Sequence, residues 1–536
     1  MPAAGKERTY GLLILVLTVL LFGTRFIGLT YNMQIHPDEN KFYFTTTSLL
    51  ESILDPDAEF KEAKEYPEGA YYFQLPFQAA GRALEILTGT DQDPQIWGRI
   101  SSVFYFTMAS LLGMILQRKY LGKSRRAVIL FGLTMCFSLF FLEHSRYGVG
   151  DMISLFLLMV ILFLTAKACD LEQAHRYFLL AFAAAGIMGA VKYPQVVFGL
   201  IPLSVFWYTR KNDSPKQWKR RLVLYGLTAF AAFLLFSPKG MLDWKYFYRV
   251  IRRESDAYLI SGTAFEAGGF WNHLAAMVLY HLLYSDFPLA FGLLAGAFVL
   301  GFRNNRDLFS GKEAPLRFLF AYAVPAMGIL FFLYNLVPSL LVFRTYTPFF
   351  GISALYTSAV AAKLLEKKGW CRVLVSVLTA IVVLRGAGLM WVLAAPEETS
   401  REFAEKVYGA TDEHWTATVR MDQYIIPFDG AALVEPTFLE LSQWEEQNGG
   451  TLEIRPGTLV ITGGYPFAQA DDYVLPLKTE DAGYIALWKE FLKVNQPYFA
   501  DRAYPDSYYY LFGGWLRGGT LSTSLIPCNY IFYRSR

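Results

Sequence analysis

Charged residues are scarce in this chain: Asp, Glu, Lys and Arg make up 18% of its 536 residues, whereas 54% are hydrophobic and 17% are aromatic. The mean hydropathy of +0.29 lies above the range of water-soluble domains, so the composition excludes an ordinary soluble fold. The formal net charge of +3 is too small to indicate a nucleic-acid partner. The composition is typical of an integral membrane protein.

Cysteines are also few, and they are far apart in the sequence. None belongs to a C-x-x-C pair or to a Cys/His spacing typical of a zinc site or redox pair; they are Cys136, Cys169, Cys371 and Cys528. A glycine-rich phosphate loop between a strand and a helix is missing as well, because GGWLRGG at 513–519 has no such setting. We therefore expect no cofactor and no metal site, although a role for a divalent metal ion is left open.

Long apolar stretches occupy most of the first 395 residues. A bilayer core takes about 20 apolar residues per helix, and eleven stretches are candidates: 10–30, 98–117, 127–143, 150–168, 176–191, 194–209, 221–237, 285–302, 316–336, 340–364 and 371–394. The first is predicted to be a retained helix, because no small-residue cleavage site follows it. The segment 71–89, which contains Pro76 and Arg82, is better suited to lying at the membrane interface.

Lys and Arg collect in five segments between or before these stretches. With eleven spans and a cytoplasmic N-terminus, all five fall on the cytoplasmic side, as the positive-inside rule requires; they are MPAAGKER, 117–126, 209–221, 301–312 and 365–372. The sequence thus predicts a multi-pass protein of the cytoplasmic membrane. The long loops 31–97, with interfacial helices, and 238–284 are then extracytoplasmic.

The C-terminal quarter has a different composition. Residues 396–536 contain no spanning stretch, so the predicted transmembrane domain covers residues 1–395 and a separate extracytoplasmic domain follows it. Strand-like patterns at 430–438 and 457–467 and an amphipathic helical pattern at 484–494 predict an α/β or α+β fold for this domain.

Acidic residues mark two of the predicted extracytoplasmic loops. Asp38 and Glu39 follow Pro37 soon after the first span, and Asp151 stands at the start of a later one. Helix capping alone explains such positions, because an acid near a helix N-terminus complements the helix dipole. Carboxylates held at the membrane surface are costly, however, and tend to mark functional sites. Two distant loops therefore bring candidate catalytic acids to one membrane face.

Basic residues on the same predicted face are candidates for binding an anion. Lys192 interrupts an apolar stretch, and Arg344 lies near the predicted extracytoplasmic end of a span. Both side chains are also suited to reaching toward lipid headgroups instead. Arg249, Arg252 and Arg253 are spaced i, i+3, i+4 among aromatic residues, which predicts a surface helix that either anchors in lipid or binds the ligand. Further candidates are His36, Arg146 and Tyr346.

The order of these motifs resembles that of a known family. HPDE, YPEGAYYFQLPF, GRISSVFYF, EHSRYGVGDMISLFLLM and GAVKYPQVVFGLIPL are together similar to the GT-C superfamily of membrane glycosyltransferases, in particular to the protein O-mannosyltransferases and the lipid A aminoarabinose transferase. The resemblance covers residues 1 to about 365 and leaves the C-terminal segment unassigned. The chain departs from the family in having a single Pro67 where two prolines are common, and the family's cationic positions vary.

This resemblance implies a reaction and roles for the candidate residues. A sugar moves from a polyprenyl-phosphate donor to a hydroxyl of a protein, lipid or glycan acceptor on the extracytoplasmic side, with inversion. Asp38 is then the general base, Glu39 holds a sugar or exchanges roles with Asp38, and Asp151 orients the acceptor or a cation. Fixed cations, Lys192, Arg344 and the three arginines, or a divalent ion stabilise the leaving phosphate.

Three other classes of protein remain as alternatives. A flippase or transporter of a lipid-linked sugar also needs polar groups near a helical membrane core, but transporters show paired halves and midplane sites, which this sequence lacks. A glycan ligase or polymerase that uses a polyprenyl diphosphate is the nearest enzymatic alternative. In a structural or sensory membrane protein, the acids are helix caps only.

Overall fold

A computed structural model describes most of the predicted membrane domain and five strands of the C-terminal region. The described residues are 3–29, 37–55, 57–61, 67–170, 174–210, 214–238, 242–243, 245, 247–249, 251–252, 274, 314–336, 343–367, 369–394, 418–419, 438–439, 459–464, 497–502 and 529–534. The chain divides into two compact units: a helical unit of Met1–Leu29, Asp38–Ile260 and Gly268–Met390, and a second unit of Thr30–Pro37, Ser261–Ala267 and Trp391–Arg536.

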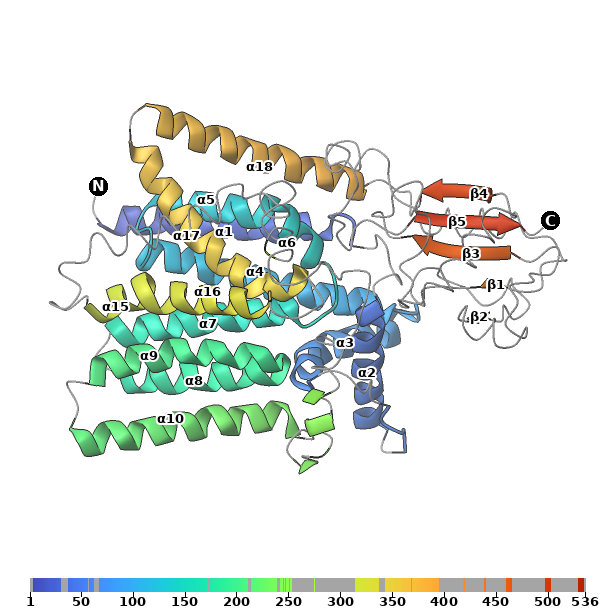
Figure 1. Cartoon of the computed structure of the whole chain (residues 1–536), viewed down its shortest axis with the longest axis horizontal. Helices are drawn as coiled ribbons and strands as arrows, with labels where there is room; N and C mark the ends of the chain where they lie inside the picture. The colour runs from blue at the N-terminus through green and yellow to red at the C-terminus, as the bar shows by residue number, and fades with distance from the viewer. Residues whose placement is uncertain are drawn as a thin grey trace. The chain divides into compact units, whose positions relative to one another are not determined.

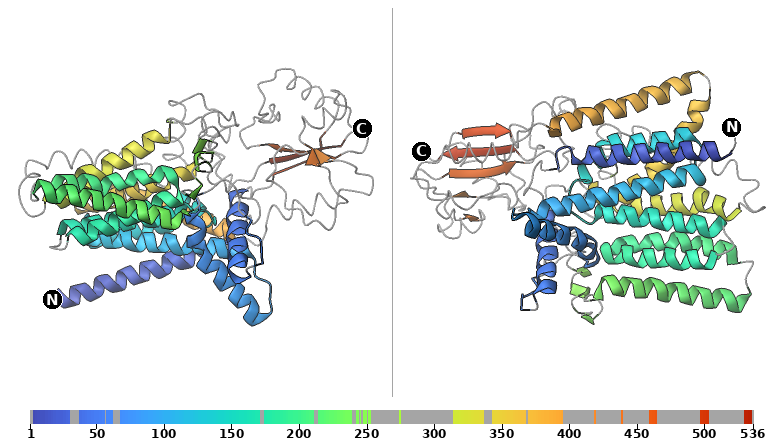
Figure 2. Two further views of the ribbon diagram at one scale, coloured as in Figure 1. Left: turned by 90° about the horizontal axis from the view of Figure 1, so that it is seen from below. Right: turned by 180° about the vertical axis from the view of Figure 1, so that it is seen from behind.

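The helical unit is a bundle in which the long helices run side by side (Figures 1 and 2). Its elements are α1 (Ala3–Phe26), α2 (Pro37–Leu54), α3 (Gly69–Thr88), α4 (Pro94–Lys119), α5 (Arg125–Phe137), α6 (Leu139–His144), α7 (Asp151–Asp170), α8 (Ala174–Val191), η1 (Tyr193–Gly199), α9 (Leu200–Thr209), α10 (Pro215–Phe236), α15 (Ala314–Phe318), η5 (Leu319–Ala323), α16 (Val324–Tyr334), η6 (Phe343–Tyr346), α17 (Thr347–Glu366) and α18 (Trp370–Ala394).

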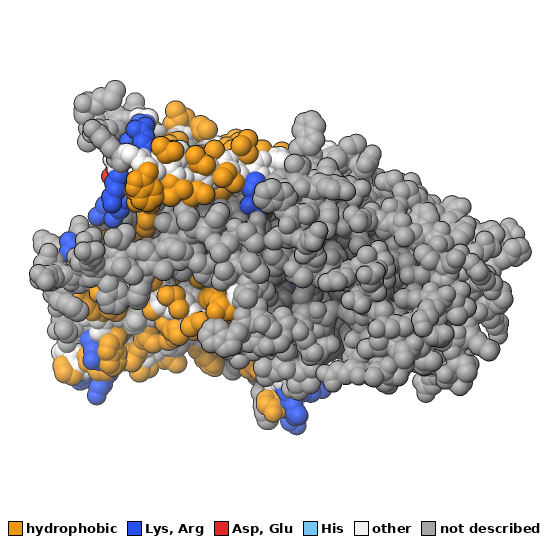
Figure 3. Space-filling view, turned by 45° about the horizontal axis from the view of Figure 1, so that its top comes forward, with side chains coloured by type: hydrophobic (Ala, Val, Ile, Leu, Met, Phe, Trp, Pro, Cys, Tyr) orange, Lys and Arg blue, Asp and Glu red, His pale blue; other side chains and the backbone are white. Residues whose placement is uncertain are grey.

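Seven segments of the described chain are helical, long and apolar enough to cross a membrane, and each coincides with a predicted span. They are Thr9–Phe26, Pro94–Lys119, Asp151–Cys169, Ala174–Val191, Ala314–Tyr334, Arg344–Glu366 and Trp370–Gly388. Apolar side chains cover the outer helix faces, and several Lys and Arg side chains gather toward one end of the unit (Figure 3). The predicted polytopic helical fold is confirmed.

The other four predicted spans differ in form. The span 127–143 is divided into α5 and α6 at Ser138, whose ψ of 126° leaves the helical region. The span 194–209 begins with the 3-10 helix η1 and continues as α9. The span 221–237 lies in α10 up to the end of that helix at Phe236, and the first turns of α10 are basic. The span 285–302 lies outside the described residues.

Arg25 explains how the interruption at Ser138 is tolerated. The side chain of Arg25 is fully buried, and its Nη1 donates a hydrogen bond of 2.9 Å to the carbonyl of Cys136. Its Nη2 donates to the carbonyl of Met135, and its guanidinium lies 4.7 Å from the ring centre of Phe106. The last carbonyls of a helix lack partners within it and carry partial negative charge. A cation from α1 therefore caps α5.

We expect Arg25→Met to destabilise the helical unit, because the two carbonyls would remain buried without hydrogen bonds. Each such loss costs about 1–3 kcal/mol, and a lower thermal midpoint of the purified protein in detergent would show it. Arg126→Met is the matched control, because it removes an arginine whose side chain is about half exposed. Arg126 forms only an exposed ion pair, with its Nη1 3.8 Å from Oε1 of Glu366. Equal midpoints for the two variants would contradict a capping role for Arg25.

The described helices alternate in direction as predicted. The N-terminus and the connections α4–α5, α9–α10 and α17–α18 lie at one end of the bundle, whereas α2, α3 and α6 lie at the other (Figure 1). This second end is called the α2 end below. There α2 runs across the direction of the long helices (Figures 1 and 2). The segment 71–89, predicted to be interfacial, forms α3, which is not among the spanning helices.

The second unit contains a mixed five-stranded sheet in the order β2-β1-β3-β5-β4. The strands are β1 (Thr418–Val419), β2 (Phe438–Leu439), β3 (Leu459–Gly464), β4 (Pro497–Arg502) and β5 (Asn529–Arg534). β1 pairs in parallel with β2 and β3, and β5 pairs antiparallel with β3 and β4. The predicted strand at 457–467 contains β3, the one at 430–438 overlaps β2 only at Phe438, and the predicted helix 484–494 lies outside the described residues.

Candidate active site

The loop between α6 and α7 delivers Asp151 to the α2 end, and side chains from three helices hold this loop. Gly148 donates its backbone N–H to Glu39 of α2 at 2.6 Å. Gln74 of α3 donates its Nε2 to the carbonyl of Gly148 at 2.9 Å, and Ser102 of α4 donates its hydroxyl to the carbonyl of Tyr147 at 2.6 Å. Because buried loop backbone must be paired, these bonds fix the approach to Asp151.

Glycine at position 148 is required by a close backbone approach. A Cβ atom at Gly148 would lie 2.9 Å from the carbonyl carbon of Gly98 and 3.2 Å from the nitrogen of Arg99. Such contacts are too short for a side chain, so the loop can pass over α4 only with glycine there. The motifs GRISS and YGVGD are thus packed directly on one another.

Glu39 and Arg99 form a buried ion pair beneath this loop. Each side chain is 1% exposed. Arg99 donates Nε to Glu39 Oε1 at 3.0 Å and Nη2 to Oε2 at 2.8 Å, which is a bidentate arrangement. Arg99 Nη1 also donates to the carbonyl of Leu29 at 2.7 Å. The pair therefore joins the end of α1, the start of α2 and the start of α4.

The carboxylate of Glu39 has little capacity left for a ligand. Oε1 accepts from Arg99 and from the N–H of Gly148, and Oε2 accepts from Arg99 and from Nε2 of Gln95 at 2.9 Å. An ionised carboxylate offers about four lone-pair sites, and all are occupied. This geometry favours a positioning role for Glu39 over the predicted contact with a sugar. Burial raises the pKa of the nearby Tyr43 above its ordinary value, and the negative charges of Asp93 and Glu39 raise it further.

Asp151, Lys192 and Arg344, three of the sequence candidates, lie next to one another in the structure. Asp151 begins α7 with its side chain 3% exposed, and its Oδ1 forms an ion pair with Nζ of Lys192, which lies between α8 and η1. Nε of Arg344, in η6, lies 4.0 Å from Oδ2 of Asp151. The three line a small cavity of about 20 Å³ together with Phe42 of α2, enough for about one water molecule.

Asp38 lies in the first turn of α2, one helical turn before Phe42. Its backbone is described, whereas its side chain lies outside the described part of the chain. Since Phe42 lines the Asp151 cavity, the helix that carries Asp38 forms one wall of that cavity. The structure therefore brings the two acidic loops to the same end of the same unit.

Two further predicted residues have structural partners. Arg146 is 2% exposed, and its Nη1 donates to the carbonyl of Leu142 at 2.7 Å within its own segment. Tyr346 is fully buried, and its hydroxyl donates to the carbonyl of Asn335 at 2.6 Å. Neither residue lines the Asp151 cavity. Both hold backbone that leads to the site.

The predicted arginine helix is described in part. Arg249 and Arg252 have helical backbone and exposed side chains, and they do not line the Asp151 cavity. Phe247, in the same segment, lies 5.1 Å from the ring of Tyr193, which follows Lys192. Arg253 and His36 lie outside the described residues.

The described residues contain no group of three His, Cys, Asp or Glu side chains that could hold a metal ion. The polar groups around Asp151 are instead a carboxylate and two cations. Within the described part of the chain, this set is suited to bind an anionic ligand next to an acid.

Several residues that build the site were not among the sequence candidates. Arg99, Gln95, Gln74 and Ser102 hold Glu39 and the loop before Asp151. One signal pointed to Arg99: an ionisable residue within a predicted span usually has a buried partner. The amides and the serine carry no such signal, because polar residues at helix ends are common.

Comparisons with known proteins agree with the motif resemblance. Residues 94–242 match the family model of dolichyl-phosphate-mannose-protein mannosyltransferases. This segment includes Arg99, Asp151 and Lys192, and the match confirms the predicted resemblance to GT-C membrane glycosyltransferases. No curated protein matches the chain.

Solved structures with a similar chain path include those of two proteins. ArnT from Cupriavidus metallidurans bound to undecaprenyl phosphate has 13% identity and a TM-score of 0.45, with 99% of this chain and 98% of that chain covered. The oligosaccharyltransferase AglB from Archaeoglobus fulgidus, in complex with an inhibitory peptide and a dolichol-phosphate, has 10% identity and a TM-score of 0.47. The match covers 76% of this chain and 59% of the AglB chain.

Proposed function

We propose that this protein is a membrane glycosyltransferase that moves a sugar from a polyprenyl-phosphate donor to an acceptor hydroxyl. The observation that carries the proposal is the pairing of Asp151 with Lys192 and Arg344 in a cavity walled by α2, the helix of Asp38. Acid and cations lie together at one end of a helical bundle, where the headgroup of a lipid-linked donor can reach them while its tail stays in the bilayer.

The donor phosphate binds Lys192 and Arg344 in this proposal. Two cations that face one buried carboxylate are already oriented toward negative charge, so a phosphate can join or replace Asp151 as their partner. The cavity of about 20 Å³ is too small for a phosphate, so donor binding must move at least one of these side chains. A contribution of Arg249, Arg252 and Arg253 to binding the donor phosphate, as the sequence predicts, is also part of this proposal.

The chemistry is an inverting displacement. Asp38 accepts the proton of the acceptor hydroxyl, whose oxygen forms a bond to the anomeric carbon. The bond between that carbon and the phosphate oxygen breaks, and the electron pair stays on the polyprenyl phosphate, where Lys192 and Arg344 stabilise it. Glu39 positions α2 and the loop before Asp151, and Asp151 orients the cations.

The site faces the extracytoplasmic side in this proposal. Four of the five basic segments are described at least in part, those near the N-terminus and at 117–126, 209–221 and 365–372, and they lie at the end of the bundle opposite α2. The positive-inside rule assigns this end to the cytoplasm. The sheet-containing unit then also lies outside, after the odd number of spans that the sequence predicts. The acceptor class, the sugar and any metal requirement are open parts of the proposal.

A transfer assay tests the donor class. Purified protein in liposomes is given a radiolabelled hexosyl polyprenyl phosphate or the corresponding nucleotide sugar, together with a membrane extract that supplies acceptors. We expect label to enter the acceptor fraction only with the lipid donor, and Lys192→Met to weaken donor binding, because the phosphate loses a charged partner worth about 1.5–3 kcal/mol.

Other outcomes would identify the alternatives. Movement of intact labelled donor across the bilayer without any transfer would favour a flippase. Turnover of a diphosphate-linked glycan but not of the monophosphate donor would favour a ligase or polymerase. Transfer from the nucleotide sugar would contradict the proposal.

A further inference from the structure

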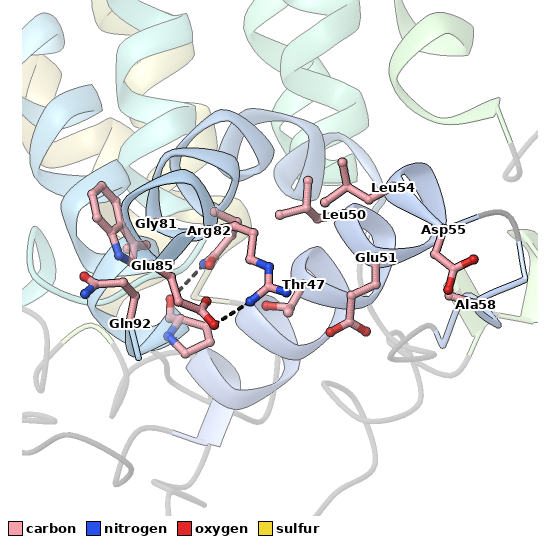
Figure 4. Close-up of a pocket in the computed structure, with 13 residues that line it drawn as sticks. Thr47, Leu50, Glu51, Leu54, Asp55, Ala58, Gly81, Arg82, Glu85 and Gln92 are labelled. Carbon is pink, nitrogen blue, oxygen red and sulfur yellow. Dashed lines mark hydrogen bonds and ion pairs between the residues drawn. The ribbon is translucent and has the colours of Figure 1, made fainter. Parts of the chain in front are cut away.

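A second pocket lies between α2, α3 and the start of α4, apart from the Asp151 cavity (Figure 4). Its volume is about 510 Å³, within the range of about 300–1,000 Å³ that ligand pockets occupy. None of the residues with a proposed role in donor binding or proton transfer lines it. It is called the α2–α3 pocket below.

The walls of the α2–α3 pocket combine an apolar side with a fixed aromatic ring. Leu50 and Leu54 line it from α2, and Trp97 lines it from α4. The Trp97 ring packs on Gly81 of α3 so closely that a Cβ there would overlap it. The spacing of α3 and α4 at this wall is therefore set by the glycine, and the pocket is a built feature of the fold.

The charged groups around the α2–α3 pocket leave an excess of negative charge. Glu51, Asp55 and Glu85 line it together with one cation, Arg82. Arg82 is ion-paired with Glu85. Glu51 and Asp55 have no ion pair with a described residue, and Asp55 accepts a hydrogen bond of 3.0 Å from the backbone of Asp57. Figure 4 shows Glu51 on α2 near the ion pair, whereas Asp55, which follows the end of α2, lies farther from it.

A buried polar atom in the same pocket lacks a partner. Thr47 of α2 lines the pocket, and its buried Oγ1 has no hydrogen-bond partner among the described residues. Gln78 also lines the pocket, and its Nε2 donates to the carbonyl of Pro94 at 2.7 Å. A buried hydroxyl without a partner is unfavourable, so a ligand that brings an N–H group completes the pocket.

We propose that the α2–α3 pocket binds a Lys- or Arg-bearing polypeptide segment, which, if the proposed function holds, is part of the acceptor. The cation pairs with Glu51 and Asp55, an N–H group meets Thr47 Oγ1, and the aliphatic stem packs on Leu50 and Leu54. A phospholipid headgroup fits less well, because its phosphate would face the three carboxylates. Anionic glycans are disfavoured for the same reason.

The position of this pocket along α2 sets a register for the acceptor. Asp38, the proposed base, lies in the first turn of α2, and Glu51 of the same helix lines the α2–α3 pocket. Glu51 follows Asp38 by thirteen helical residues, which at about 1.5 Å each separate them by about 20 Å. An extended polypeptide covers this distance in about six residues. The basic residue therefore lies about six positions from the hydroxyl that receives the sugar.

Peptide binding to the full-length protein in detergent tests the proposal. The probe is a fluorescein-labelled peptide with Lys-Lys about six residues from a Ser, and the matched probe has Glu-Glu instead. We expect the Lys-Lys peptide to bind more tightly than the Glu-Glu peptide. We expect Glu51→Gln/Asp55→Asn to weaken binding of the Lys-Lys peptide about fivefold, because it removes two exposed ion pairs, each of which contributes modestly. Glu366→Gln, an exposed acid of α17, is expected to leave the affinity unchanged.

The outcomes separate the pocket from the reaction. Equal affinity for both peptides, or no loss of affinity in the double variant, would overturn the proposal. The proposal would also be overturned if phosphatidylethanolamine vesicles displaced the Lys-Lys peptide from the wild-type protein and Glu51→Gln/Asp55→Asn abolished vesicle binding, because the pocket would then bind a lipid headgroup. Peptide binding is measured without the sugar donor, and it is repeated on the Asp38→Asn variant. Position 38 does not line the pocket, so this variant tests peptide binding separately from the reaction. Charge-selective binding without transfer in any assay would support the pocket and count against the proposed function.

Discussion

Asp38→Asn is expected to abolish sugar transfer while donor binding persists. The substitution keeps the size of the side chain and removes its ability to accept a proton, and general base catalysis contributes about 10²–10⁴-fold to rates. Asp38 lies in the first turn of α2, whose Phe42 walls the cavity of Asp151. The measurements are the transfer rate at saturating donor and the donor dissociation constant, because their separation distinguishes catalysis from binding.

The control for this variant is Asp91→Asn. Asp91 is an exposed acid in the connection between α3 and α4 and does not line either pocket, so its variant should transfer at the wild-type rate. An Asp38→Asn protein that keeps most of its activity would remove Asp38 as the base. Loss of donor binding together with transfer would instead assign Asp38 to the donor site.

Short-range sequence patterns were sufficient to predict the helical membrane fold of this protein. Length and hydropathy located all seven helices that the structure shows to be long enough to span, because a bilayer imposes one length on each crossing. The distribution of Lys and Arg then assigned Asp151, Lys192 and Arg344 to one end. The structure brings these three together in one cavity.

Partners across long sequence distances could not be predicted in the same way. Glu39 stands beside Asp38 in a motif that suggested chemistry for both, yet it is paired with Arg99 and with the backbone of Gly148. Tyr346 resembled a site residue but is a buried donor to Asn335. A helix position shows which face a residue occupies, whereas the partner depends on how separate helices dock.

Glu39→Gln is expected to destabilise the helical unit strongly. Arg99 would remain 1% exposed without its counter-charge, and breaking a fully buried ion pair costs about 3–5 kcal/mol. Removing Arg99 as well, in Glu39→Gln/Arg99→Met, should recover part of the loss, because no uncompensated charge remains. Glu366→Gln breaks only an exposed pair of 3.8 Å with Arg126 and should leave the thermal midpoint in detergent unchanged.

The same variant tests whether Glu39 positions the site through the loop. Glutamine keeps only one carbonyl oxygen as an acceptor, so it cannot accept hydrogen bonds from Gly148, Gln95 and Arg99 together. The loop before Asp151 therefore loses part of its support. Transfer should then fall in proportion to the fraction of unfolded or misaligned protein, and it should recover with stability in the double variant. If Glu39→Gln melts like the wild type yet transfers no sugar, Glu39 acts on the substrate itself, and its buried pairing with Arg99 does not describe the working enzyme.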